Sequence, residues 1–298
     1  MDGNGINFST LPYLEVPTSD IGLLGSSSSL FLVEEEFKKL RSALSSFGYI
    51  QVVTKSRRSR HFLDVTRKFF KLPLDEKKKY SREENEIDGY GNNIIYTENQ
   101  TLDWNDRLLS SFAPWEHEEA RKMASNSQET FLEFTSKLQL MNEIIVKAMA
   151  KSLKLEKHSF LDQFGKNPIS LTRLKFCPPC PWLDCVLAAK PHGDASGTTY
   201  LLQDKEVEGL QVPKDDQWYR VPLTPDAIVF NCGDQLEIMT NGIFKSPIHR
   251  VVTNKEKERT VALFFSPELT IKFESEFEFQ ILHIYHRSNY ENIYYQYI

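Results

Sequence analysis

The spacing of apolar and polar positions divides the chain into a first half rich in helices and a second half rich in strands. In the first half, apolar residues recur three or four positions apart, as they do along one face of a helix. Phe37, Leu40 and Leu44 have this spacing, and Gly48 follows them as a C-terminal cap. The predicted helices cover residues 34–47, about 61–71, 75–80 and about 127–153.

Strands are predicted at Tyr49–Val53 and, from about residue 170, wherever a short β-prone run lies between Pro, Gly, Asn or Asp residues. Strands at this spacing are typical of a sandwich or barrel. A short strand is also expected at 11–16, and a loop from Tyr90. The strands predicted in the second half are Leu171–Phe176, Thr198–Leu202, Leu210–Val212, Arg220–Pro222, Ala227–Asn231, Glu237–Thr240, Val251–Thr253 and Thr260–Phe265.

Composition narrows the class of protein. The chain has 298 residues, of which 40% are hydrophobic, so one large domain with a sizeable core is expected. The net charge is −5 with no basic stripe, so we expect no nucleic-acid partner. No apolar run approaches the roughly 20 residues that span a bilayer, and the first residues do not resemble a signal peptide. We therefore expect a soluble, cytoplasmic monomer with no membrane partner.

Four cysteines are present: Cys177, Cys180, Cys185 and Cys232. Cys177 and Cys180 form a C-x-x-C motif, but two prolines lie inside it and Pro181 follows, which disfavours the helix of a redox motif. A zinc site would need a second paired motif. Reduced structural thiols are the better interpretation.

The segment His192-Gly193-Asp194 carries the most informative chemistry. In an extended strand, residues i and i+2 point to the same side, so His192 and Asp194 can bind one metal ion. His249 lies in another β-rich stretch and supplies a third candidate ligand. Two imidazoles and one carboxylate are the facial triad that holds non-haem Fe(II) with open positions. An H-x-D pair alone is a weak signal, and a lone histidine is more often structural.

The residues that flank these three candidates make the signal specific, because their sequence resembles the plant family of 2-oxoglutarate- and Fe(II)-dependent dioxygenases. Within that family it is most similar to the specialised-metabolism branch, which includes norcoclaurine-synthase-like proteins and alkaloid O-demethylases. The resemblance covers most of the chain, and its strongest passages are Pro178-Pro179-Cys180-Pro181, Lys190-Pro191-His192-Gly193-Asp194, Leu201-Leu202-Gln203-Asp204, Val207-Glu208-Gly209-Leu210-Gln211, Asn231-Cys232-Gly233-Asp234 and Lys245-Ser246-Pro247-Ile248-His249-Arg250-Val251.

The resemblance implies a mainly β fold with α-helices: a double-stranded β-helix, or jelly-roll, core with packed N-terminal helices. It implies an N-terminal region at 1–165, the Fe(II)/2-oxoglutarate core at 166–270 and a shortened C-terminal segment at 271–298. His192, Asp194 and His249 would be the metal ligands and catalytic residues. Arg259 would bind the distal carboxylate of 2-oxoglutarate, and a guanidinium suits that bidentate contact. Phe265 matches a position that often faces the substrate, with core packing as the alternative.

Two departures concern the cosubstrate site. The family usually has serine two residues after the arginine, where this chain has Val261, and tyrosine before the Pro-Pro-Cys-Pro run, where it has Cys177. Two of three expected donors are therefore missing. Hydrogen bonds to charged groups contribute roughly 1.5–3 kcal/mol each, so cosubstrate affinity is expected to be weak. Thr260 is a poor replacement, since adjacent strand residues point to opposite faces.

Two functions remain open at this point. The first is an enzyme that uses Fe(II), 2-oxoglutarate, O₂ and ascorbate as reductant to hydroxylate, desaturate or O-demethylate a small plant specialised metabolite or hormone. The second is a weakly active or inactive paralogue that binds a small molecule or a partner. An Fe(II) oxidase that uses another reductant is a minor third. The motifs do not identify the substrate.

Overall fold

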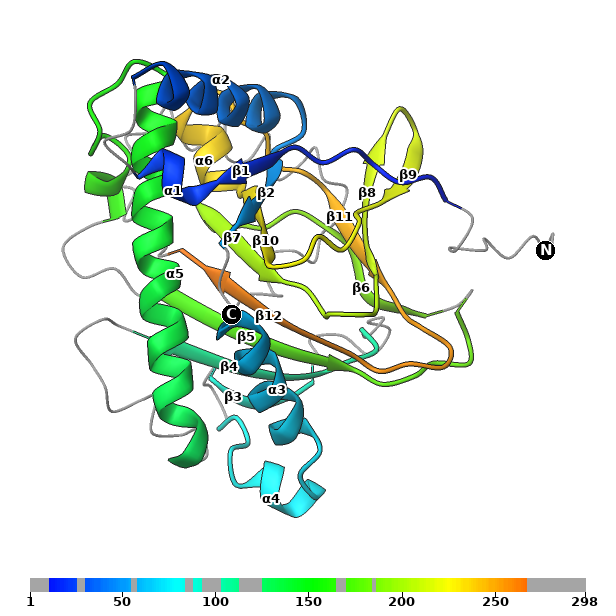
Figure 1. Ribbon diagram of the computed structural model, residues 1–298. Helices are drawn as coiled ribbons and strands as arrows, with labels where there is room; N and C mark the ends of the chain where they lie inside the picture. Colours follow the sequence, from blue (N-terminus) through cyan, green and yellow to red (C-terminus); the bar gives the residue numbers. More distant parts are fainter. Residues whose placement is uncertain are drawn as a thin grey trace, which may run out of the picture.

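The structure is a computed structural model that describes residues 11–25, 30–54, 58–83, 88–92, 103–112, 125–164, 170–183 and 186–266 (Figure 1). Its described strands form two sheets, in which all strand pairs are antiparallel except β1 with β2. The large sheet has the order β1 (Thr18–Asp20), β2 (Tyr49–Val53), β10 (Ala227–Cys232), β7 (Thr198–Leu202), β12 (Arg259–Phe265), β5 (Ser170–Cys177), β4 (Asp106–Phe112) and β3 (Gly89–Gly91). The small sheet has the order β6 (Leu187–His192), β11 (His249–Val252), β8 (Leu210–Lys214) and β9 (Gln217–Arg220).

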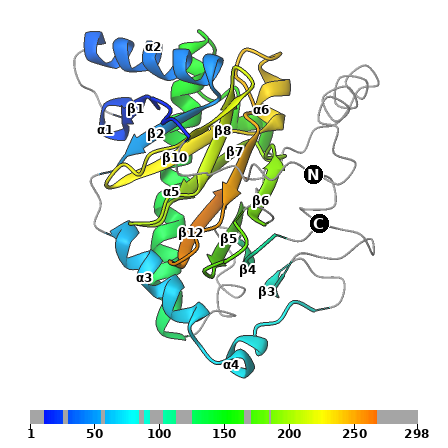
Figure 2. The same ribbon diagram turned by 90° about the vertical axis from the view of Figure 1, so that its right-hand side faces the viewer.

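The two faces of the large sheet have different partners. In Figure 1, α5 (Ser125–Ser152) stands on one side of this sheet and the small sheet on the other, and Figure 2 shows α2 (Leu30–Ser46) and α3 (Arg58–Phe70) on the same side as α5. Strand residues of alternate position therefore enter two separate cores. The outer core joins the sheet to the helices, and the inner core, which includes Leu201, Val212, Val229 and Val261, lies between the sheets. The jelly-roll prediction is confirmed.

Most predicted helices and strands are present. The four helix predictions correspond to α2, α3, α4 (Leu74–Lys78) and α5, and the strand prediction at Tyr49–Val53 matches β2. Gly48 caps α2 as expected: its φ is +76°, and its N–H donates to the Ala43 carbonyl at 3.2 Å. A Cβ at Gly48 would lie 2.2 Å from the Lys245 carbonyl oxygen, so glycine is required there for space as well.

Several predictions are wrong. Glu237–Thr240 is not a strand: α6 covers Asp234–Met239, because Gly233 is extended at its N-cap and Asp234 and Glu237 favour its first turn. Residues 11–16 form only an isolated bridge, from Tyr13 to Arg220.

Other differences concern where strands begin and end, and strands that were not predicted. Of the strand predicted at 220–222, only Arg220 lies in β9. Tyr90 belongs to the short strand β3 rather than to a loop. Strands β4 and β6 had no counterpart in the predictions. The short helices α1 (Ile21–Leu24) and η3 (Leu161–Phe164) complete the described elements.

Three described cysteines, Cys177, Cys180 and Cys232, are buried and free, in agreement with reduced thiols. Cys185 and residues 271–298 lie outside the described residues. Among the described helices, none has the length and apolarity needed to cross a membrane.

Candidate metal centre

The three predicted metal ligands come together at one end of the β6–β11 strand pair of the small sheet. His192 is the last residue of β6 and His249 is the first residue of β11, and the two are directly paired across these antiparallel strands. The pairing brings together residues that are far apart in the sequence. Asp194 lies in the loop just after β6, not in the strand as predicted, and this loop carries its carboxylate to the two imidazoles.

The spacing of the donor atoms fits a single ion. His192 Nε2 lies 4.0 Å and His249 Nε2 lies 3.9 Å from Asp194 Oδ1. One atom from each residue lies within 4.8 Å of the others. Two metal–ligand bonds of about 2.1 Å span at most about 4.2 Å, so one ion can join each histidine to the aspartate. Among the described residues this is the one group of three or more such side chains close enough to hold a metal.

Both imidazoles present a free Nε2 to this point. His192 Nδ1 lies 2.6 Å from the Lys190 carbonyl oxygen and His249 Nδ1 lies 3.2 Å from that of Pro247. A carbonyl oxygen only accepts, so each Nδ1 donates a proton there, and Nε2 is the nitrogen that each ring can offer to a metal ion. Burial, and then the neighbouring His249, lower the pKa of His192 to about 3. His192 is therefore neutral at physiological pH, as a metal ligand must be.

Asp194 is held as a carboxylate. Its side chain is 1% exposed, and burial alone would raise its pKa. Its neighbours His249 and His192, together with a hydrogen bond from Asn231, lower that pKa to about 2. Asn231 Nδ2 donates to Asp194 Oδ2 at 2.7 Å, which leaves Oδ1 directed at the two histidines.

The backbone around Asp194 is fixed by the segment after β10. The N–H of Asp234 donates to the Asp194 carbonyl at 2.8 Å, and the N–H of Gly233 donates to the Gly197 carbonyl at 2.8 Å. A Cβ at Gly233 would lie 1.9 Å from the Ser196 carbonyl oxygen, so only glycine fits. Asn231, Gly233 and Asp234 belong to a passage that carries the family resemblance, but the sequence predicted no role for them. The polar Asn231, directly after the apolar run Ala227–Phe230, was the signal that pointed to a role.

Arg259 begins β12 and faces the interior between the sheets. It is 3% exposed, and its Nε donates to the Val207 carbonyl at 3.2 Å. Its Nη2 is buried and has no hydrogen-bond partner among the described residues. A buried guanidinium with an unsatisfied donor is costly without an anion. This orphaned donor fits the carboxylate of a dicarboxylic cosubstrate.

A loop built around Asp204 positions that guanidinium. Asp204 accepts hydrogen bonds from the N–H groups of Glu206, Val207 and Thr260, at 3.0, 3.2 and 2.9 Å. It therefore ties the loop that carries the Val207 carbonyl to the start of β12. A Cβ at Gly209 would lie 3.1 Å from Arg259 Nε, so the glycine lets the arginine pack against the loop.

The two unusual positions flank Arg259. Cys177 is paired with Arg259 across β5 and β12, and Val261 is paired with Lys175. Both are buried, and burial raises the pKa of the Cys177 thiol, so it is neutral. Val261 packs in the inner core and offers no hydrogen bond. The Thr260 hydroxyl is buried without a partner on the described part of the chain, and its strand position faces the opposite way.

Phe265 lies on the same face of β12 as Arg259 and Val261, since it is an even number of residues away. Its side chain is 2% exposed, and the Arg173 guanidinium lies 5.3 Å from the centre of its ring. It is buried on the inner side of the sheet, where a substrate contact and a packing role are both available to it.

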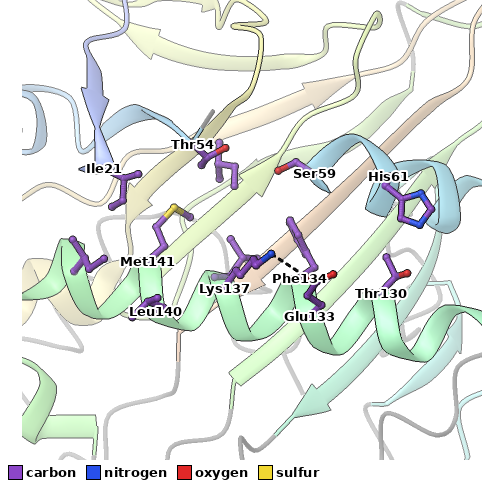
Figure 3. A pocket seen from close by; sticks show the side chains of 13 residues that line it. Ile21, Thr54, Ser59, His61, Thr130, Glu133, Phe134, Lys137, Leu140 and Met141 are labelled. Atoms are coloured by element: carbon purple, nitrogen blue, oxygen red, sulfur yellow. Dashed lines mark hydrogen bonds and ion pairs between the residues drawn. The ribbon is translucent and has the colours of Figure 1, made fainter. Parts of the chain in front are cut away.

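A cavity of about 620 Å³ lies on the helix-covered side of the large sheet, away from the small sheet (Figure 3). It is bordered by α5 and the start of α3, and Phe134, Leu138 and Met141 give it an apolar wall. It contains none of the triad, and its Glu133 and Lys137 are paired with each other at 2.9 Å. We assign it no chemistry.

Comparison with known proteins agrees with this geometry. Residues 168–268 match the family model of the 2OG-Fe(II) oxygenase superfamily, and residues 16–130 match that of the non-haem dioxygenase in morphine synthesis N-terminal region. The chain is 35% identical over 260 residues to Protein SRG1 of Arabidopsis thaliana, covering 84% of this chain and 72% of that protein. It is 33% identical to codeine O-demethylase of Papaver somniferum, covering 89% and 76%. A crystal structure of JOX2 in complex with 2OG, Fe and JA superposes with a TM-score of 0.77 at 28% identity, covering 93% and 87%.

Proposed function

Because the chain belongs to the 2OG-Fe(II) oxygenase superfamily, we propose that it oxidises a small plant specialised metabolite or hormone by hydroxylation, desaturation or O-demethylation. The observation that carries this proposal is the convergence of His192, Asp194 and His249 on one point, with the orphaned guanidinium of Arg259 buried in the same interior. The relatives' names support the substrate class, since they include demethylases of an alkaloid and of a flavonoid.

Each side chain has a proposed role. His192, Asp194 and His249 hold Fe(II), which supplies the oxygen chemistry when bound, using O₂ and 2-oxoglutarate. Arg259 binds the distal carboxylate of 2-oxoglutarate. Asn231 keeps Asp194 oriented and ionised, and the small sheet helps to exclude water from the interior. Phe265 is proposed as a substrate contact, and ascorbate as the reductant that keeps the iron ferrous.

A second candidate function is a weakly active or inactive paralogue that binds a small molecule or a partner. The specific observation in its favour is the pair Val261 and Cys177, because neither offers a strong donor to a cosubstrate carboxylate beside Arg259. The neutral His192 and the ionised Asp194 favour the enzyme, since both are in the state that binds a metal.

The experiment that separates these functions is release of succinate. Purified protein would be incubated with Fe(II), ascorbate and 2-oxoglutarate, and in parallel with Fe(II) and ascorbate alone. Succinate in the first reaction, absent from an Asp194→Ala control, supports the oxygenase. O₂ consumption without 2-oxoglutarate would favour an oxidase that uses another reductant, and no turnover in either reaction would favour the inactive paralogue.

The proposed setting is that of a cytoplasmic monomer that binds only small molecules, with no membrane or nucleic-acid partner. We also propose the division into an N-terminal region at 1–165, a core at 166–270 and a short segment at 271–298. The family matches at 16–130 and 168–268 support the first boundary.

A further inference from the structure

The start of β12 is held from outside the large sheet by the helix α3, which packs against β12 and β5 on the helix-covered side (Figure 2). In the last turn of α3, Arg67 reaches two carboxylates beyond its own helix. Its Nη2 lies 3.1 Å from Asp204 Oδ2, and its Nε lies 3.6 Å from Glu258 Oε1. Its Nη1 lies 3.2 Å from Asp64 of the same helix. Since Glu258 directly precedes Arg259, α3 contacts β12 beside the proposed cosubstrate arginine.

The carboxylate of Asp204 takes the place of a strand partner at the start of β12. In the pairing of β7 with β12, Ala262 is the residue of β12 nearest to this start. Two residues before it, the Thr260 N–H donates to Asp204 Oδ2 at 2.9 Å rather than to a β7 carbonyl. The other oxygen, Oδ1, accepts from the N–H of Val207 at 3.2 Å, and the carbonyl of Val207 accepts from Arg259 Nε. Asp204 therefore fixes both the backbone after Arg259 and the group that binds its guanidinium.

Arg67 also compensates the charge of Asp204. The Asp204 side chain is 3% exposed, and a buried carboxylate is costly unless a cation is paired with it. Burial lowers the pKa of the Arg259 guanidinium and Asp204 acts against that lowering, so Asp204 and Arg259 attract each other. Without Arg67, Asp204 would compete with an incoming carboxylate for the charge of Arg259.

We propose that Arg67 is a positioning residue for 2-oxoglutarate, which acts through Asp204 to hold Arg259 in place and to leave its charge to the distal carboxylate of the cosubstrate. The inference rests on the proposed oxygenase function. It extends the cosubstrate site from the jelly-roll core to a helix of the N-terminal region, which then contributes to affinity without touching the ligand.

The test compares two ligands that differ only at the distal carboxylate. 2-Oxoglutarate and 2-oxovalerate, which has a methyl group in place of that carboxylate, would each be titrated to saturation into Fe(II)-loaded protein without O₂, with the heat recorded. The wild type should bind 2-oxoglutarate more tightly. Arg67→Gln should weaken 2-oxoglutarate roughly tenfold, the size of about one hydrogen bond to a charged group, and leave 2-oxovalerate unchanged.

Two further variants separate this role from general support of the helix. Lys71 directly follows α3, and its Nζ lies 2.9 Å from the same Glu258 carboxylate. Lys71→Gln is therefore the matched control, and it should bind 2-oxoglutarate within about twofold of the wild type, because an exposed ion pair contributes little. Arg67→Lys keeps a cation for Asp204 and should recover most of the preference for 2-oxoglutarate over 2-oxovalerate.

The preference between the two ligands is the decisive readout, because a purely structural loss at Arg67 weakens both alike. The inference is overturned by an equal loss for both ligands, by an unchanged preference in the folded variant, or by the same loss in Lys71→Gln. Arg67→Met, which keeps the apolar stem, is measured in the same way if Arg67→Gln does not fold. Failure of the proposed function is seen separately, as a wild type that neither binds 2-oxoglutarate nor releases succinate.

Discussion

Val261→Ser is expected to tighten the binding of 2-oxoglutarate. Val261 lies two residues beyond Arg259 on the same face of β12, so a hydroxyl there points toward the carboxylate that Arg259 is proposed to hold. A hydrogen bond to a charged group contributes about 1.5–3 kcal/mol. At 1.4 kcal/mol per factor of ten, the dissociation constant should fall by about 10- to 150-fold.

The same change should destabilise the unliganded protein. Val261 is 2% exposed and packs in the inner core, so the serine loses apolar contact and buries a hydroxyl. We expect the free energy of unfolding to fall by about 1–3 kcal/mol. Stability without ligand and affinity for the cosubstrate should therefore move in opposite directions, which a nonspecific loosening of the core would not produce.

Calorimetric titration of 2-oxoglutarate into the iron-loaded protein, with chemical denaturation in parallel, checks both values. Val212→Ser is the matched control, because Val212 is also 2% exposed in the inner core but lies on β8 of the other sheet. It should lose stability without gaining affinity. If Val261→Ser binds 2-oxoglutarate no better than Val212→Ser while folded, the cosubstrate does not lie against β12 in the proposed way.

Three further changes test the surrounding structure. Arg259→Lys keeps the charge but loses the two-pronged contact, so the same titration should show roughly tenfold weaker 2-oxoglutarate binding, and an unchanged value would place the carboxylate elsewhere. Asn231→Ala removes the hydrogen bond to Asp194 and should weaken Fe(II) affinity by about 10- to 100-fold, whereas wild-type affinity would show that this contact is dispensable. Gly233→Ala forces a Cβ to within 1.9 Å of a carbonyl oxygen and should cost about 1–3 kcal/mol of unfolding free energy or more, while Gly91→Ala, with nothing within 4 Å, should cost under about 0.5 kcal/mol; equal costs would contradict the packing.

Much of this structure could be predicted from the sequence, because patterns among neighbouring residues specify it. The apolar period of α2 and α5 and the glycine after α2 depend only on neighbouring residues. The candidate metal ligands could be proposed from the sequence because His192 and Asp194 are two residues apart, and because the sequence around His249 is specific. The family resemblance then supplied the topology that apolar periodicity alone does not specify.

The remaining features depend on long-range register. That Asn231 supports Asp194 follows only once β10 and the loop after β6 are placed together. That Arg67 is paired with Asp204 follows only once α3 is packed against β12. The helix α6 was mistaken for a strand because Ile238, near its end, and Thr240, its C-cap residue, are β-branched, whereas the extended Gly233 at the N-cap begins a helix.

Binding of Fe(II) by the wild type and by three single variants, His192→Ala, Asp194→Ala and His249→Ala, tests the central claim most directly. The measurement is anaerobic titration with iron determined after desalting, beside circular dichroism to confirm the fold. We predict one iron per chain in the wild type and loss of stoichiometric iron in each variant, with the secondary structure unchanged. A folded variant that retains one iron per chain would remove that residue from the metal site, and retention by all three would contradict the account.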